Sequence, residues 1–370
     1  MTSYTQAVAG PVIVAIPVRD EAARIEACLT ALGNQVGAQA DHIVLLVNNS
    51  TDDTASLARR IRLRPGTTLH VQERRLPPAQ ANAGHARRLV MQEAAKLACE
   101  CGVLLTTDAD SVADPDWIAA NLAAIAAGAD AVAGWVDLDP ADWSRIPLRL
   151  HEDDARECAY DALCDEMHAL LDPDPADPLP RHTQHSGASI AVTVAAFRQV
   201  GGIPAVPSGE DRAFLAALRV ADAHIRHAPE CHVVVSGRIE GRATGGMADT
   251  IRRRLISSDA FLDDRLEPAE DCARRAALRH RLRGCVADSA LLPAFARDVA
   301  LAPERIERYL ACGRFGAAWA EIEACSVMLQ RRLVAVADLP AQMAQAEAIC
   351  ATLRTQVKAR ARMATLENAD

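Results

Sequence analysis

The first 135 residues alternate short apolar runs with stretches of helical periodicity, and this alternation constrains the fold more than any other feature. The runs are rich in β-branched residues and have the length of strands that are buried on both faces. Repeated strand–helix units predict an α/β fold with a doubly wound, mostly parallel sheet that binds ligands at the carboxyl ends of its strands. The predicted strands are Val12–Pro17, His42–Val47, Leu69–Gln72, Val103–Thr106 and Ala131–Trp135.

The remainder of the chain follows a different pattern. Residues 149–171 are charged and predicted to be helical, and the segment 172–180 is predicted to be irregular because its prolines cannot continue a helix. Beyond residue 250 the pattern is helical throughout, with long helices predicted at Phe315–Leu339 and Ala341–Met363. A chain of 370 residues exceeds one ordinary domain. We therefore expect an α/β domain over residues 1–250 and an all-α C-terminal region over residues 251–370.

Charge and composition exclude several classes of protein. The net charge of −9 argues against nucleic acid as a partner. No apolar run reaches the roughly 18 residues that a membrane span requires, and the first residues lack the pattern of a secretory signal. The eleven cysteines are scattered without repeated CxxC pairs, which favours a reducing compartment. We expect a cytoplasmic protein, either free or peripheral to the inner face of the membrane.

Polar residues follow two of the predicted strands. Asn48 and Asn49 follow the second strand, and Asp108 and Asp110 follow the fourth. Carboxylates at strand ends can hold a divalent cation between phosphate oxygens, although solvated turn carboxylates fit the same pattern. No glycine follows the first strand, so the G-x-G-x-x-G motif of dinucleotide-dependent oxidoreductases is absent. The Walker A motif is also absent.

Six segments resemble, in the same order, the motifs of the family 2 glycosyltransferases of GT-A fold. These segments are IPVRDEAARI, VNNSTDDT, ANAGHARR, TTDADSVADPDW, GASIAVTVAAFRQVGGI and GEDRAF. The family transfers a sugar from a nucleotide-sugar to an acceptor hydroxyl, usually with inversion. The resemblance implies a GT-A-type, Rossmann-like sheet flanked by helices, with a nucleotide-sugar half in residues 1–135 and an acceptor half in residues 136–250.

The resemblance also implies roles for four acidic residues. Asp110 would hold Mg²⁺ or Mn²⁺ against the donor diphosphate, and Asp108 would contact the metal or the ribose. The cation would neutralise the charge that develops on the leaving nucleoside diphosphate. Asp211 would be the general base that removes the proton of the acceptor hydroxyl, and Glu210 would orient the acceptor or the base.

Further residues are expected around these four. His232 is a candidate third metal ligand, with a structural role in the strand Cys231–Val235 as the alternative. Arg238 and Arg242 suit a diphosphate or an anionic acceptor, with an ordinary surface loop as the alternative. The residues expected to bind the nucleotide-sugar are Pro17, Arg19, Glu21, Asn48, Asn49, Arg87, Asp108, Ala109, Arg238 and Arg242. Those expected on the acceptor side are Gly187, Ala188 and Ser189.

The sequence departs from the family pattern at Asn48 and Asn49, where the family carries paired acids. The donor is therefore expected to be of UDP or GDP type without a choice between them. A retaining transferase of the same fold and a nucleotide-sugar-binding module without turnover remain alternatives. Only 3% of residues are aromatic, so few side chains can stack on a sugar ring, which favours a small polar acceptor. A peripheral-membrane acceptor also remains open, and the C-terminal helices can form either a bundle or a homodimer interface.

Overall fold

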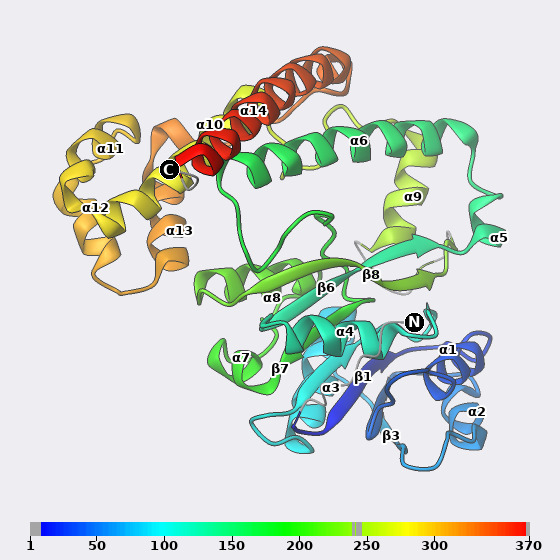
Figure 1. Ribbon diagram of the computed structural model, residues 1–370. Coiled ribbons are helices and arrows are strands. Elements are labelled where there is room, and N and C mark those ends of the chain that lie inside the picture. The colour runs from blue at the N-terminus through cyan, green and yellow to red at the C-terminus, as the bar shows by residue number, and fades with distance from the viewer. Residues whose placement is uncertain (1–8, 239–240, 242–245, 368–370) are drawn as a thin grey trace. The chain divides into compact units, whose positions relative to one another are not determined.

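The computed structural model describes residues 9–238, 241 and 246–367, and they form two compact units. Figure 1 shows the chain in order from blue to red. The N-terminal unit comprises the residues up to 146 together with 180–256, and the helical unit comprises 147–179 together with the residues from 257. Segment 147–179, which was expected in the acceptor half, thus packs with the C-terminal helices. Its Tyr160 and Met167 are fully buried in one apolar cluster with Cys272 and Cys350 of those helices.

The described part of the N-terminal unit is built on an eight-stranded sheet with the order β3-β2-β1-β4-β7-β6-β8-β5. Strands β3, β2, β1 and β4 are mutually parallel, and so are β6 and β8. Strand β7 runs antiparallel to both of its neighbours, β4 and β6, and β5 runs antiparallel to β8. The predicted α/β class is confirmed. The strands are β1 (Val12–Val18), β2 (His42–Asn48), β3 (Thr68–Arg74), β4 (Val103–Thr106), β5 (Val112–Ala113), β6 (Ala131–Leu138), β7 (Ile190–Thr193) and β8 (Ile225–Val235).

Helices cover both faces of this sheet. Val14 and Ile16 of β1 pack with the apolar side chains of α1 and α4, whereas Ile13 of the same strand packs with those of α3 and α8. Successive strand residues point to opposite faces, so two buried faces require the continuous apolar runs seen in the sequence. The helices of this unit are α1 (Ile25–Gly33), α2 (Thr54–Arg60), η1 (Pro78–Gln80), α3 (Ala83–Lys96), α4 (Trp117–Ala126), α5 (Pro140–Trp143), α7 (Val194–Gln199), α8 (Glu210–Val220) and α9 (Met247–Ile256).

The helical unit contains no strand among its described residues, which confirms the all-α C-terminal region. Its long helix α14 lies beside α6 (Figure 1), and Arg354 of α14 pairs with Glu166 of α6 at 2.5 Å. The helices are α6 (Leu148–Leu171), α10 (Ala269–Ala287), η2 (Ser289–Leu291), α11 (Leu292–Asp298), α12 (Pro303–Leu310), α13 (Phe315–Cys325), η3 (Val327–Leu329), η4 (Val336–Asp338) and α14 (Leu339–Glu367).

The prediction of one helix across residues 315–339 is wrong, because α13 ends at Cys325. The buried Ser326 that follows donates its hydroxyl to the carbonyl of Val299 at 2.7 Å and accepts the N–H of Met328 at 3.2 Å. A serine side chain that bonds the backbone in this way competes with helix continuation. In the described part of the chain, no helix is both long and apolar enough to cross a membrane.

Candidate active site

A buried arginine, Arg87 of α3, connects the end of β4 to the start of α8. Its Nη2 donates to Asp108 at 2.5 Å and its Nε donates to Glu210 at 2.9 Å. Its Nη1 donates to the hydroxyl of Thr106 at 2.9 Å and to the carbonyl of Gly187 at 2.8 Å. Arg87 is only 5% exposed. One guanidinium therefore fixes the relative positions of the segments that were expected to bind donor and acceptor.

Two glycines allow Arg87 and α8 to approach so closely. A Cβ atom at Gly187 would lie 2.6 Å from Cζ of Arg87, and one at Gly84 would lie 2.2 Å from the carbonyl oxygen of Val206. Helix α3 itself begins at a side-chain cap, where Asn82 accepts the N–H of His85 at 2.8 Å. Glycine is thus required at positions 84 and 187 because the backbone has no room for a side chain.

Electrostatics keeps this arginine charged. Burial lowers the pKa of Arg87, but the carboxylates of Asp108 and Glu210 raise it above its ordinary value. The carboxylate of Glu210 is itself 7% exposed as a side chain and pairs with Arg87. In this structure, the contact of the Glu210 carboxylate is with Arg87.

The adjacent Asp211 is half-buried and lies against the acceptor segment. Its Oδ2 accepts the N–H of Gly187 at 2.8 Å, and its Oδ1 accepts the N–H of Arg212 at 2.7 Å. Gly187, Ala188 and Ser189, which were expected on the acceptor side, are all buried. The hydroxyl of Ser189 accepts from Trp117 Nε1 and donates to the carbonyl of Cys231, both at 2.9 Å. The side chains of Ala188 and Ser189 are thus enclosed by the protein, at 1% and 0% exposure.

On the donor side, Arg238 joins two carboxylates. Its Nη1 donates to Glu21 Oε2 at 2.8 Å, and its Nη2 donates to Glu21 Oε1 and lies 3.1 Å from Asp110 Oδ2. Burial and the neighbouring Asp108 raise the pKa of Asp110 to about 7, although Arg238 lowers it. Burial raises the pKa of the Cys28 thiol, and Asp110, Asp108 and Glu21 raise it further. The thiol of Cys28 lies 3.5 Å from the backbone carbonyl oxygen of Asp108.

The donor set of Glu21 and Asp110 fits a hard divalent cation. Both carboxylates contact one cationic nitrogen of Arg238, and Mg²⁺ is commonly bound by one or two carboxylates plus substrate phosphates. Among the described residues, no group of three or more His, Cys, Asp and Glu side chains is arranged to hold a metal. The expected third ligand, His232, instead lies 3.0 Å from Asp114 and 3.2 Å from Asp137. The structure thus favours the structural role of His232.

The other residues expected to bind the donor lie at neighbouring strand ends, because β2, β1 and β4 are adjacent in the sheet. Pro17 lies in β1 opposite Leu46 of β2, and Arg19 donates to the carbonyl of Ala81 at 3.2 Å. Asn48 and Ala109 are buried at 3% exposure. Both groups of the Asn49 amide bond the backbone of Leu76, at 2.9 and 3.0 Å. Arg242 lies outside the described residues.

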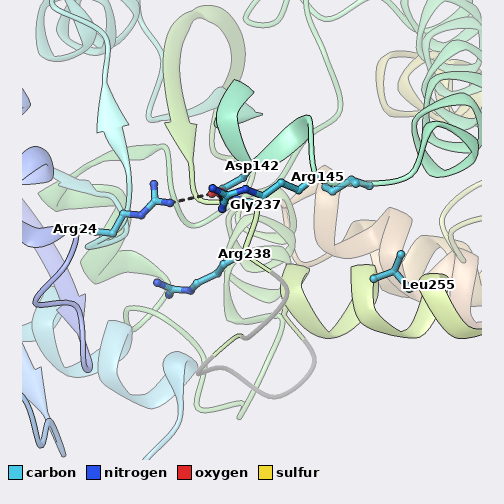
Figure 2. A pocket seen from close by; sticks show the side chains of 7 residues that line it. Arg24, Asp142, Arg145, Gly237, Arg238 and Leu255 are labelled. Carbon is cyan, nitrogen blue, oxygen red and sulfur yellow. Dashed lines mark hydrogen bonds and ion pairs between the residues drawn. The ribbon is translucent and has the colours of Figure 1, made fainter.

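Sequence reasoning missed Asp142, which organises a pocket of about 220 Å³ beside Arg238 (Figure 2). Asp142 accepts hydrogen bonds from Arg24 at 2.9 Å, from Arg145 at 3.3 Å, from the Ser236 hydroxyl at 3.1 Å and from the Gly237 N–H at 3.0 Å. Three of these donors come from residues 94 to 118 positions away, so no local pattern marks Asp142. The pocket is lined by Arg24, Asp142, Arg145, Ile146, Gly237, Arg238 and Leu255.

Comparison with known families decides the class of this site. Residues 13–187 match the family model described as Glycosyl transferase family 2. The chain carries a family 2 glycosyltransferase domain. This match confirms two predictions from the sequence, namely the family and the glycosyltransferase class of enzyme. The matched region includes Glu21, Arg87, Asp108 and Asp110, whereas Glu210, Asp211 and Arg238 lie beyond it.

Comparison with solved structures finds glycosyltransferases at low sequence identity. A mannosyltransferase from Pyrobaculum calidifontis in complex with GDP-Man and Mn²⁺ is 17% identical, with 97% of this chain and 86% of that chain covered and a TM-score of 0.45. Residues 1–349 of S. aureus TarS in complex with UDP are 15% identical, with coverages of 94% and 92% and a TM-score of 0.45. Glucosyl-3-phosphoglycerate synthase from Mycobacterium tuberculosis with Mn²⁺, UDP and phosphoglyceric acid is 16% identical, with coverages of 68% and 78% and a TM-score of 0.41. A search of curated proteins found no match.

Proposed function

We propose that this glycosyltransferase moves a sugar from a nucleoside-diphospho-sugar to an acceptor hydroxyl with inversion, using a divalent cation and Asp211 as the general base. The observation that carries the proposal is the Arg87 bridge, which joins Asp108 of the donor side to Glu210 at 2.5 and 2.9 Å. Glu210 directly precedes Asp211 at the start of α8. The bridge supports the proposal because it would hold Asp108 and the neighbouring Asp211 in one rigid framework, as a displacement at a sugar carbon requires.

The donor side would bind the diphosphate through a cation and arginines. Glu21 and Asp110 would hold Mg²⁺ or Mn²⁺, which supplies charge neutralisation for the leaving nucleoside diphosphate. Arg238, which already contacts both carboxylates, can reach the same diphosphate and pair with it through two nitrogens. Asp108 remains paired with Arg87, so we assign it to ribose contacts and to positioning.

The acceptor side would deprotonate and align the nucleophile. Asp211 is half-buried, whereas Glu210 is only 5% exposed, so Asp211 is the member of the pair that an acceptor can reach. The hydroxyl oxygen attacks the anomeric carbon, its proton passes to Asp211, and the bond from that carbon to the diphosphate oxygen breaks. Two backbone N–H groups, of Gly187 and Arg212, hold the carboxylate in place. One displacement of this kind inverts the anomeric configuration.

The donor class and the setting of the reaction form part of the same proposal. The donor would be of UDP or GDP type, and the acceptor a small polar molecule or one carried at a membrane surface. The enzyme would act in the cytoplasm, free or peripheral to the inner face of the membrane. Helices of the helical unit would support a homodimer.

A donor panel tests the proposal directly. The full chain is incubated with UDP- and GDP-sugars and Mn²⁺, and release of the nucleoside diphosphate is followed. Proton NMR of the product gives its anomeric configuration. Asp211→Asn should abolish most of the turnover. The matched control is Asp116→Asn, because Asp116 is exposed and its side chain makes no capping hydrogen bond to the start of α4. If no donor binds or turns over, the transferase proposal fails. A product that keeps the donor configuration would exclude inversion.

A further inference from the structure

The guanidinium of Arg238 lies in the position of a cation between Glu21 and Asp110. Its Nη2 contacts both carboxylates, at Glu21 Oε1 and at Asp110 Oδ2. The side chains are 7% exposed for Glu21 and 16% for Asp110, against 27% for Arg238. Two little-exposed carboxylates thus share one nitrogen, and that nitrogen belongs to the most exposed member of the group.

The turn that carries Arg238 is fixed by Asp142. The carboxylate of Asp142 accepts from Ser236 and from Gly237, which directly precede Arg238, and from Arg24 of the opposite wall. Burial raises the pKa of Asp142, but the Ser236 hydroxyl and the charge of Arg24 lower it below its ordinary value. Figure 2 shows Arg24 directed at Asp142, while the guanidinium of Arg238 points away from it. The backbone of the turn is therefore anchored separately from the arginine head group.

We propose that Glu21 and Asp110 form the cation site, that Glu21 is its second protein ligand, and that Arg238 is its resident cation until the metal displaces it. This inference rests on the proposed function, since the metal is the one invoked there. A guanidinium and a divalent cation cannot occupy the same carboxylate oxygens, because like charges a few ångströms apart repel strongly in a partly buried site. Metal binding to the free enzyme must therefore break the contacts of Arg238.

The donor would favour the exchange. Its diphosphate offers Arg238 new anionic oxygens and supplies further ligands to the metal. The pocket of about 220 Å³ that Arg238 lines gives the side chain space to move while its turn stays bound to Asp142. Metal and nucleotide would then raise each other's affinity, because coupling between two binding events is reciprocal. The free enzyme would bind the metal weakly.

Metal binding without nucleotide tests the exchange. Mn²⁺ is titrated into the full chain, and free Mn²⁺ is measured by electron paramagnetic resonance. Arg238→Gln should bind Mn²⁺ about tenfold or more tightly than the wild type, within the usual range of coupling between sites. The control is Arg145→Gln, which removes an equal charge from the same pocket. Arg145 is 79% exposed and pairs with Asp142 at 3.3 Å. Equal affinities of Arg238→Gln and the wild type would overturn the proposal, and so would an equal gain in Arg145→Gln.

A second comparison tests Glu21 as a ligand. In the Arg238→Gln background, Glu21→Gln should remove the gained affinity, and unchanged tight binding would exclude Glu21. If Arg238→Gln does not fold, Arg238→Lys keeps the charge without the two-nitrogen fork, and its Mn²⁺ affinity should exceed that of the wild type. An Arg238→Lys affinity equal to the wild type would then overturn the exchange. None of these titrations needs a donor. A wild type without turnover therefore refutes the proposed function alone, whereas turnover with unchanged Mn²⁺ affinity in the variants refutes this inference alone.

Discussion

Replacing Arg87 by methionine removes the charge that joins Asp108 to Glu210 while keeping an unbranched side chain. The substitution breaks the contacts with Asp108 and Glu210 at 2.5 and 2.9 Å and those with Thr106 and Gly187. Glu210 is 5% exposed, so its carboxylate would remain buried without a cation. Removing one partner of a buried pair costs about 3–5 kcal/mol of folding free energy. We expect Arg87→Met to lose stability in this range.

Thermal unfolding measures this loss. For a unit of 150–250 residues, each kcal/mol shifts the midpoint by about 2–4 °C, so the N-terminal unit should melt roughly 6–20 °C earlier. Arg59→Met is the control, because Arg59 pairs with Glu73 at 2.6 Å while about half of each side chain is exposed. Pairs of that kind contribute about 0–1 kcal/mol. The expected loss in Arg87→Met therefore exceeds that in Arg59→Met by at least about 2 kcal/mol.

The double variant Arg87→Met/Glu210→Gln separates the charge from the packing. Because the neutral amide needs no cation, the double variant should lose less stability than the sum of the two single variants. Strict additivity would show that the pair contributes no coupling. A loss in Arg87→Met no larger than in Arg59→Met would refute the idea that this buried bridge holds the N-terminal unit together.

Three further predictions concern the same site. Asp211→Asn should lower kcat by at least about 100-fold, as expected for loss of a general base, and near-normal turnover would exclude that role. Because burial and Asp108 raise the pKa of Asp110 to about 7, this carboxylate protonates as the pH falls below about 7. The Kd for Mn²⁺ should therefore rise about tenfold per pH unit there, and a flat Kd from pH 5.5 to 8 would contradict the ligand assignment. Gly187→Ala should lose about 1–3 kcal/mol in urea unfolding, because its Cβ would lie 2.6 Å from Arg87 Cζ. The control Gly284→Ala meets only Leu291 at 3.5 Å and should change stability by less than about 1 kcal/mol.

The sequence predicted the strands of the nucleotide half because burial on both faces leaves a continuous apolar run. Val12–Pro17 corresponds to β1 (Val12–Val18), and Val103–Thr106 corresponds to β4 without change of bounds. The antiparallel direction of β7 was not predicted, since a strand of four residues carries no signal of its orientation. The break after Cys325 was missed for a related reason: the carbonyl of Val299 that accepts from Ser326 lies 27 residues away.

The motifs gave candidate site residues but not the contacts between them. Arg87, Asp108 and Glu210 do meet, and no motif indicated that Glu210 pairs with an arginine 123 residues away. The contact of Arg238 with Glu21 spans 217 residues. Pairings of this kind depend on the tertiary fold, because the sheet brings distant strand ends together and the turn at Gly237 sets the position of Arg238. Motifs read one at a time therefore give candidate residues but not which of them pair.

The two arginines of the site differ in a way that has mechanistic consequences. Arg87 is 5% exposed, and its three nitrogens donate hydrogen bonds to four residues in three separate segments. Its removal therefore disturbs the relative positions of these segments. Arg238 has a side chain 27% exposed, and its turn is anchored through Asp142 rather than through its own head group. Among the described residues, the guanidinium of Arg238 contacts only the carboxylates of Glu21 and Asp110. In the proposed exchange it leaves them for a diphosphate while its turn stays bound to Asp142. In the proposed mechanism, Arg87 would be a fixed cation that aligns donor and base, and Arg238 would be a cation whose place a metal can take, so only Arg238 should respond to Mn²⁺.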